Sequence, residues 1–453
     1  MVLPWEVLAA SWILAAPVHG FSSFNTTCTI PHRRYDYVQG PNTRGSLQIV
    51  WSCLATLIAC TYTVLHLNVL EQRDGRDGGV ASYLKARSRG PSPYSELMPL
   101  DTEAEAPRAF KLTASQLEDR SIQTELYWWF KGFAKTLVWM IITIISPEWY
   151  ALIAVDNLVS AIRNKAKFTQ LPSHCHPPRG WTLAHMFFAN MGGFAIRSNT
   201  KRRAGDIDHL TAKSLLQLMR LQGRYIEGDS LPNQEDIQDR SKSDFFAKSL
   251  IVLQVSWFIV NCIARLASGL PTTQLEMSVF GTATCSLFTY AILFEKPYSV
   301  KSVTILLSFD MPMPGDVAEI LGSDQEQRNL SGVIRNLQDP YPSFTGMATV
   351  VGFAAVIGAF HIAAWDFAFP SHADMWVWRI SSVVSCAMLP VALPMLWAIE
   401  SLYGSSKFAF STMLFAALYV GTRAILAVEM IRFFFFIPPG GFGTTWADNV
   451  PHI

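Results

Sequence analysis

Acidic residues lie within or at the edges of long apolar segments in this 453-residue chain. An ionised carboxylate in hydrocarbon is costly, so such residues usually serve a function or pair with another charge. A buried carboxylic acid that keeps its proton can protonate a substrate. Proton-transfer chemistry inside a membrane is therefore the first hypothesis. The acids in question are Glu148, Asp156, Glu276, Asp366, Glu400 and Glu429.

Three of these acids and one histidine are the leading catalytic candidates: Glu148, Glu276, Asp366 and His185. Glu148 follows Pro147, where a broken helix would open a cavity, although an acid there also stabilises a helix N-terminus. Glu276 has capping-box spacing from Thr272 or Thr273, so capping explains it equally well. His185 either orients an acid or a substrate oxygen, or is a core histidine bonded to a backbone carbonyl.

The other intramembrane charges have structural explanations. Long basic side chains near helix ends extend to the interface, and we assign this role to Arg265, Arg379, Arg423 and Lys296. Glu429 precedes Arg432 by three residues, a spacing that permits a local ion pair.

Seven apolar segments must position these residues, and each is about as long as a bilayer core requires. Half of the residues are hydrophobic, 16% are charged and the net charge is +1, which gives no field to attract nucleic acid. We therefore predict an all-α, polytopic membrane bundle over residues 47–437. The segments are Leu47–Val64, Phe133–Val155, Phe246–Leu266, Thr272–Phe294, Met347–Phe369, Trp376–Ile399 and Phe410–Ile437.

The ends of the chain and its loops set the expected topology. Residues 1–20 are signal-like or an uncleaved first helix, and residues 21–46 form a lumenal segment with a glycosylation sequon at Asn25. Loops 71–126, 197–245 and 296–343 are expected in the cytosol, the first two because they are basic, and residues 438–453 form a C-terminal tail. An extra short crossing at Leu183–Ile196 would keep the basic loops on one side and give seven to eight spans. The alternative is a re-entrant hairpin broken at Pro147.

The seven cysteines contain no CxxC pair, so we predict no metal site and no cofactor. His174, Cys175 and His176 stand together but have no second ligand cluster. In the eight-span topology Cys28 and Cys175 both face the lumen, which predicts a disulfide between them.

The densest motif, at Trp181–Phe194, reads W-T-x-x-H-x-F-F-A-x-M-G-G-F. Together with four other blocks it resembles a fungal family of integral membrane proteins that includes meroterpenoid-pathway terpene cyclases of the macrophorin type. The other blocks are Pro147-Glu148, Leu270–Glu276, Tyr37–Ser46 and Pro438–Trp446.

The resemblance implies an enzyme that protonates an olefin or epoxide at the end of a farnesyl chain on a polyketide-derived ring, without loss of diphosphate. Its partners would be the bilayer and a hydrophobic prenylated substrate, and its location the endoplasmic reticulum. In agreement, the apolar segments contain neither DDxxD nor DxDD, so they offer no carboxylate cluster for magnesium. The alternatives are a proton-coupled transporter, in which the same acids carry a proton or solute, and an accessory protein.

Overall fold

The computed structural model describes residues 43–66, 122–198, 206–221, 226, 231–239, 245–298, 300, 303–309, 314–328, 344–403 and 405–446. Most of these residues are helical. The signal-like segment, the Asn25 sequon and Cys28 lie outside the described residues.

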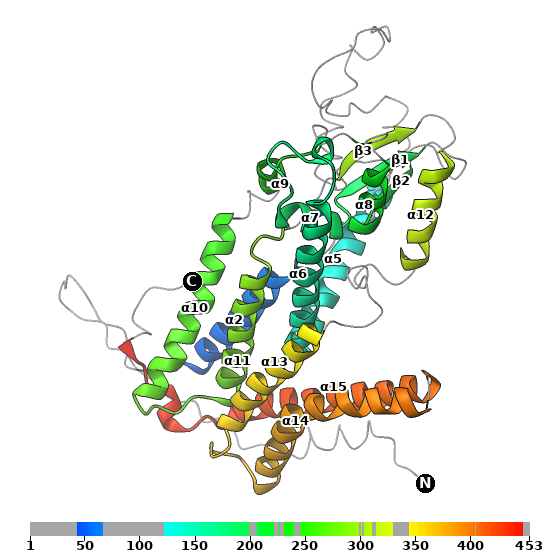
Figure 1. Cartoon of the computed structure of the whole chain (residues 1–453). Helices are drawn as coiled ribbons and strands as arrows, with labels where there is room; N and C mark the ends of the chain where they lie inside the picture. The colour runs from blue at the N-terminus through cyan, green and yellow to red at the C-terminus, as the bar shows by residue number, and fades with distance from the viewer. Residues whose placement is uncertain are drawn as a thin grey trace, which may run out of the picture.

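Most of the long helices run roughly in one direction and form the body of the molecule, whereas α15 lies across one end of them (Figure 1). Within the described residues, five helices are long and apolar enough to cross a bilayer, or six if one bent pair counts as a span. The five are α2 (Ser46–Val64), α10 (Phe245–Ala267), α13 (Phe344–Ala363), α14 (His372–Tyr403) and α15 (Ser405–Phe433). The expected membrane bundle is therefore supported, but the count of seven to eight spans is not reached.

α11 (Gln274–Ile292) occupies the middle of this bundle and contacts α2, α6, α10 and α13. It falls within the predicted segment Thr272–Phe294, yet it is not among the five apolar candidates. Thr282, Ser286 and Thr289 of α11 are buried, and Thr282 and Thr289 donate to carbonyl oxygens four residues earlier. Neighbouring helices therefore shield a helix whose sequence is less apolar.

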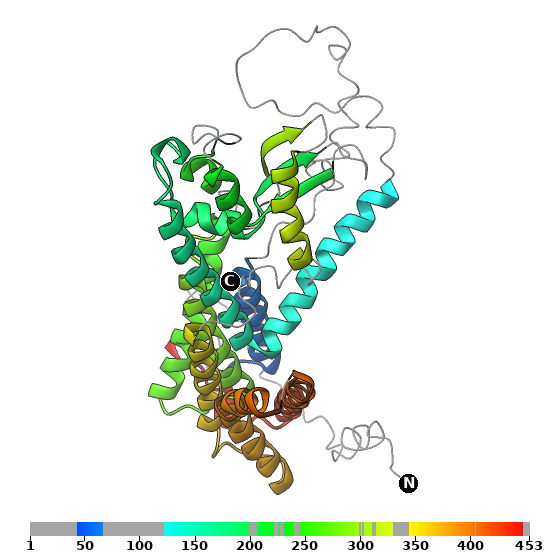
Figure 2. The same ribbon diagram turned by 45° about the vertical axis from the view of Figure 1, so that its right-hand side comes forward.

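The bent pair is α5 (Ile122–Ile145) and α6 (Pro147–Phe168), between which the chain bends by 109°. Pro147 begins α6, where its missing N–H costs no helical hydrogen bond. The far ends of both helices point towards the same end of the molecule (Figure 2). The bend at Pro147 is that of a broken span or of a re-entrant hairpin, the alternative considered for this residue.

The predicted crossing at Leu183–Ile196 is wrong. Leu183–Asn190 form α7, whose eight residues are too short to span, and Phe194–Ser198 form strand β1. Gly192 ends α7 with φ 78°, a left-handed conformation that glycine adopts without a Cβ clash. Gly192 thus ends the helix, and the chain continues directly into a strand.

One end of the molecule carries a three-stranded sheet, so the chain is not purely α-helical. β1 pairs antiparallel with β2 (Asp206–Leu210) and parallel with β3 (Thr304–Phe309), in the order β2-β1-β3. Helices α8 (Ala212–Arg220), α9 (Gln234–Asp239) and α12 (Gly315–Arg328) lie nearby (Figure 1). Parts of two predicted loops, 197–245 and 296–343, therefore fold together on one side of the bundle.

The α5–α6 hairpin also explains how basic segments stay on one side without an extra crossing. The start of α5, which follows loop 71–126, points to the end of the molecule that carries the sheet (Figure 2). Cys175 lies at this end too, because its Sγ is 3.7 Å from the carbonyl oxygen of Met219 in α8. The lumenal position assumed for Cys175 is thus lost, and with it the reason for the predicted disulfide.

Candidate functional site

Glu148 is buried in the bundle at the first turn of α6, with 1% of its surface exposed. The Ser146 hydroxyl donates to its Oε1 at 3.0 Å. Nη2 of Arg423, from α15, lies 3.4 Å from Oε1 and 3.3 Å from Oε2. Glu148 therefore both stabilises a helix N-terminus, as its position predicts, and forms a long-range buried ion pair.

Tyr419 fixes the guanidinium of this pair. Its hydroxyl oxygen accepts hydrogen bonds from Nε and Nη2 of Arg423 at 3.0 and 2.9 Å. Tyr419 is one turn earlier on α15, and its ring centre is 5.3 Å from the Arg423 Cζ. The role at the interface that we predicted for Arg423 is wrong, because only 9% of its surface is exposed.

His361, from α13, lies within electrostatic reach of Arg423. Its Nδ1 is 2.7 Å from the Ile357 carbonyl oxygen, so Nδ1 carries the hydrogen and donates it. Its Nε2 is then the acceptor for the Ser278 hydroxyl of α11, at 3.3 Å. The Trp378 indole N–H donates to the His361 carbonyl at 3.1 Å.

We call Glu148, Ser278, His361, Tyr419 and Arg423 the Glu148 cluster. Cys285 lies on the same side of α11 as Ser278 and within electrostatic reach of Glu148 and Arg423. The cluster draws on four helices, α6, α11, α13 and α15. Charges inside an apolar bundle carry a desolvation cost that hydrogen bonds only partly offset. Such groups are retained in membrane proteins chiefly where they serve a function.

Glu276 is outside this cluster. It lies nine residues before Cys285 on α11, a half-integral number of turns, so the two side chains project from opposite faces. Its Oε2 accepts from the backbone N–H and hydroxyl of Thr273 at 2.8 and 3.0 Å, and its own N–H donates to the Thr273 hydroxyl at 3.1 Å. The capping explanation for Glu276 is confirmed.

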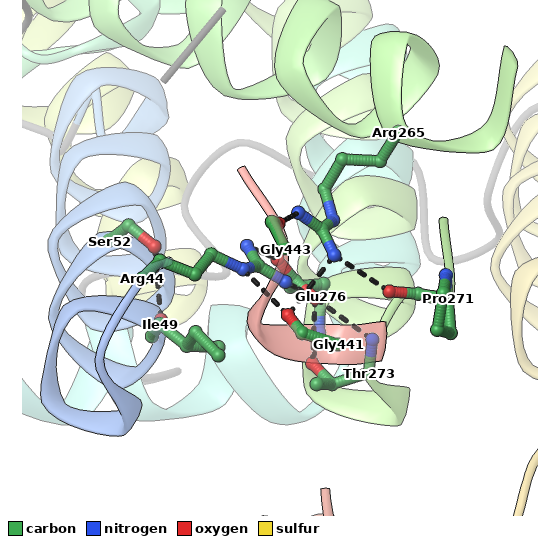
Figure 3. A network of polar contacts seen from close by, with 9 residues as sticks. All are labelled: Arg44, Ile49, Ser52, Arg265, Pro271, Thr273, Glu276, Gly441 and Gly443. Carbon is green, nitrogen blue, oxygen red and sulfur yellow. Dashed lines mark hydrogen bonds and ion pairs between the residues drawn. The ribbon is translucent and has the colours of Figure 1, made fainter. Parts of the chain in front are cut away.

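Glu276 also pairs with Arg44, which precedes α2 (Figure 3). Two nitrogens of the guanidinium, Nη1 and Nη2, donate to Oε1 and Oε2 of Glu276 at 2.5 and 3.0 Å, and both side chains are at most 5% exposed. Arg44 Nε donates to the carbonyl oxygen of Gly441 at 2.9 Å. The carboxylate is thus saturated by bonds that hold the structure together.

Arg265 of α10 completes this network, in which the two ends of the described chain meet (Figure 3). It donates to the carbonyl oxygens of Gly443, Pro271 and Gly441 at 2.7, 2.8 and 3.1 Å. Arg265 is completely buried, so its predicted interfacial role is also wrong. We call Arg44, Arg265, Glu276, Gly441 and Gly443 the terminal latch. It joins three of the sequence blocks on which the family resemblance rests, at residues 37–46, 270–276 and 438–446.

A small cavity of about 30 Å³ borders the latch between α2 and α10, with Gln48, Ser52, Gln254 and Asn261 in its wall. This volume suits about one water molecule. The latch therefore has no room for a prenylated substrate.

Asp366 does not belong to a buried site. It lies in the connection after α13 with a side chain that is 90% exposed, and it pairs with Arg379 at 3.2 Å. The expectation that Asp366 is an intramembrane acid is wrong, because α13 ends at Ala363.

His185 has a structural environment at the start of α7. Its Nδ1 is 2.7 Å from the Thr182 hydroxyl, and Nε2 is 2.9 Å from the Pro232 carbonyl oxygen. Burial lowers the pKa of this imidazole. The core-histidine explanation is thus confirmed.

His185 is also far from Glu148. Its ring packs on Trp181, which packs on Phe168 at the far end of α6. Phe168 lies 20 residues after Glu148, about 30 Å along the helix axis. The structure therefore does not bring these two predicted site residues together.

One further member of the Glu148 cluster could have been predicted from the sequence: Arg423, a basic residue in the middle of an apolar segment. Ser278, His361 and Tyr419 could not, because serine, histidine and tyrosine are common in membrane helices. Among the described residues, no group of three or more His, Cys, Asp or Glu side chains is placed to hold a metal ion.

Comparison with known proteins gives one match. Residues 114–315 match the sequence model of a family of unknown function, DUF8562. This stretch includes Glu148, His185 and Glu276, but neither Arg423 nor the C-terminal part of the latch. No curated protein and no solved structure matches the chain.

Proposed function

We propose that this protein is an integral membrane terpene cyclase that protonates the farnesyl chain of a meroterpenoid at the Glu148 cluster. The observation that carries the proposal is a carboxyl group buried at the break between α5 and α6 and paired with Arg423, whose guanidinium is held by the Tyr419 hydroxyl. The motif resemblance supplies the substrate class.

The proposed step moves one proton and breaks no diphosphate bond. Ser146 donates to Oε1 of Glu148, and Nη2 of Arg423 lies 3.4 and 3.3 Å from its two oxygens. The step requires Glu148 to take up a proton before the substrate reacts. That proton adds to the terminal olefin carbon or to the epoxide oxygen, and the π electrons of successive double bonds form the new carbon–carbon bonds. The last carbocation loses a proton to a base. Product and substrate are then isomers.

Aromatic rings next to the cluster are suited to stabilise the positive charge. Tyr419 lies against Arg423, and the Trp378 ring centre is 5.7 Å from that of His361. Aromatic faces attract cations by electrostatic interaction with the π system. In this proposal Arg423 positions the Glu148 carboxyl, and His361 holds the Ser278 hydroxyl.

The proposed location is the endoplasmic reticulum, with the sheet in the cytosol. Basic residues at that end of the molecule include Lys165, Lys167, Lys213 and Arg220, which is the distribution that the positive-inside rule predicts for a cytosolic face.

The test uses microsomes that contain the full-length protein, supplied with a farnesylated phenol or a farnesylated epoxycyclohexenone. Products are followed by mass spectrometry and NMR. Glu148→Gln keeps the shape of the side chain but removes the acid, so cyclised product should fall by at least about 100-fold, in the range of lost general acid catalysis. Glu400→Gln, a half-buried acid of α14, is the matched control and should retain activity. Absence of cyclisation by folded wild-type protein on all of these substrates would refute the proposal.

A proton-coupled transporter is the second candidate. The specific observation in its favour is the buried Glu148–Arg423 ion pair at a helix break, a feature of ion and proton pathways. Proteoliposomes with an internal pH dye distinguish the two. Proton uptake that depends on Glu148, without any cyclised product, would favour the transporter.

A further inference from the structure

A third buried ionic group, besides the Glu148 cluster and the terminal latch, lies where the start of α14 meets the end of α15. Asp374 and Glu429 each expose only 3% of their side chains. Both face Arg432, whose Nη1 is 2.9 Å from Asp374 Oδ1 and 3.2 Å from Glu429 Oε1. The predicted pair between Glu429 and Arg432 is therefore present, with a second acid that the sequence did not reveal.

The charges in this group do not balance if both acids are ionised. Asp374 from α14 and Arg432 from α15 are the charged groups that act on Glu429. Two carboxylates and one guanidinium give a net charge of −1 in a buried place. An uncompensated buried charge is costly, and binding one proton removes it.

Asp374 and Glu429 differ in how readily each would bind that proton. Asp374 lies in the first turn of α14, where the helix dipole favours a negative charge. Its Oδ2 accepts from the Ser371 hydroxyl at 2.9 Å, and its N–H donates to the same hydroxyl at 3.2 Å. Asp374 also makes the shorter contact with Arg432. The ionised form of Asp374 is thus well stabilised.

Glu429 has a poorer environment for a negative charge. Its Oε2 is buried and has no hydrogen-bond partner among the residues that the structure describes. Leu426 and Phe433, one turn away on either side, are buried apolar residues that pack with Trp378. An oxygen without a donor in such surroundings favours the neutral acid.

We propose that Glu429 is a proton-binding site: at neutral pH its carboxyl group holds one exchangeable proton, while Asp374 and Arg432 remain an ion pair. The ligand is the proton itself. This inference does not depend on the proposed cyclase activity, because the three residues lie outside the Glu148 cluster.

Infrared spectroscopy of the full-length protein in nanodiscs tests this site, because a protonated carboxyl gives a C=O band that shifts in D₂O. At pH 7, Glu429→Gln should remove one component of this band, whereas Glu148→Gln and Glu400→Gln should leave that component in place. Asp374→Asn should also remove this component, because Arg432 would then pair with Glu429 alone and Glu429 would ionise.

Size-exclusion chromatography and thermal melts establish that each variant is folded. If Glu429→Gln does not fold, Asp374→Asn carries the test alone, since Glu429 is still present in that variant. An acid band that is unchanged in folded Glu429→Gln, or in folded Asp374→Asn, would overturn the proposal.

Discussion

Removing the charge of Glu276 should destabilise the protein by breaking the terminal latch. Glu276→Gln keeps an oxygen that can accept from Thr273, so the helix cap survives in part while the ion pair with Arg44 is lost. Arg44 is 5% exposed and would remain as a buried charge without its carboxylate. Removing one partner of a buried pair costs about 3–5 kcal/mol.

An exposed pair of the same chemistry provides the control. Arg179 and Glu235 also form an ion pair, but their side chains are 66% and 67% exposed. Such pairs contribute about 0–1 kcal/mol, so Glu235→Gln should change stability little. The two variants therefore differ in burial and not in the substitution made.

The assay is the unfolding of purified protein in detergent, followed by tryptophan fluorescence against temperature and denaturant. Glu276→Gln should unfold well below the wild type, and Glu235→Gln close to it. The double variant Arg44→Met with Glu276→Met should lose less stability than the sum of its single variants, because the first substitution already breaks the pair. Equal losses for Glu276→Gln and Glu235→Gln would refute the reasoning.

Two further predictions concern packing and pH. A Cβ at Gly346 would lie 2.5 Å from Asp156 Oδ1, so Gly346→Ala should lower the melting temperature. Gly352 is on the same helix and a Cβ there would have no atom within 4 Å, so Gly352→Ala should leave the melting temperature unchanged. Equal melting temperatures for the two variants would contradict the prediction. Burial lowers the pKa of Lys296 to about 7, so the unfolded chain binds a proton more tightly and stability should rise by about 1.4 kcal/mol per pH unit from about pH 7 to 10.5. Lys296→Met should raise stability at pH 7.5 and flatten this rise, and an unchanged slope would show that Lys296 is charged in the fold.

The sequence by itself determined the features that depend on neighbours a few residues apart. Apolar length predicted the membrane helices, and Pro147 marked the break between α5 and α6. The spacing of Thr273 and Glu276 predicted a cap, and that of Glu429 and Arg432 an ion pair. These features follow from helix geometry, which relates residues three or four positions apart wherever the helix lies in the fold.

Tertiary structure alone decided which charges are buried together. Glu148 pairs with Arg423 across 275 residues, and Arg44 with Glu276 across 232. Residue order carries no information on the distance between these helices, so Arg423 was wrongly assigned to the interface.

Strand pairing was decided in the same way. Phe194–Ser198 looked like the end of an apolar crossing because the segment before it is apolar. It became the central strand of a sheet because it pairs with Asp206–Leu210 on one side and, on the other, with Thr304–Phe309, more than a hundred residues later. Local composition cannot encode such a partner, since a strand is stable only when another strand satisfies its backbone hydrogen bonds.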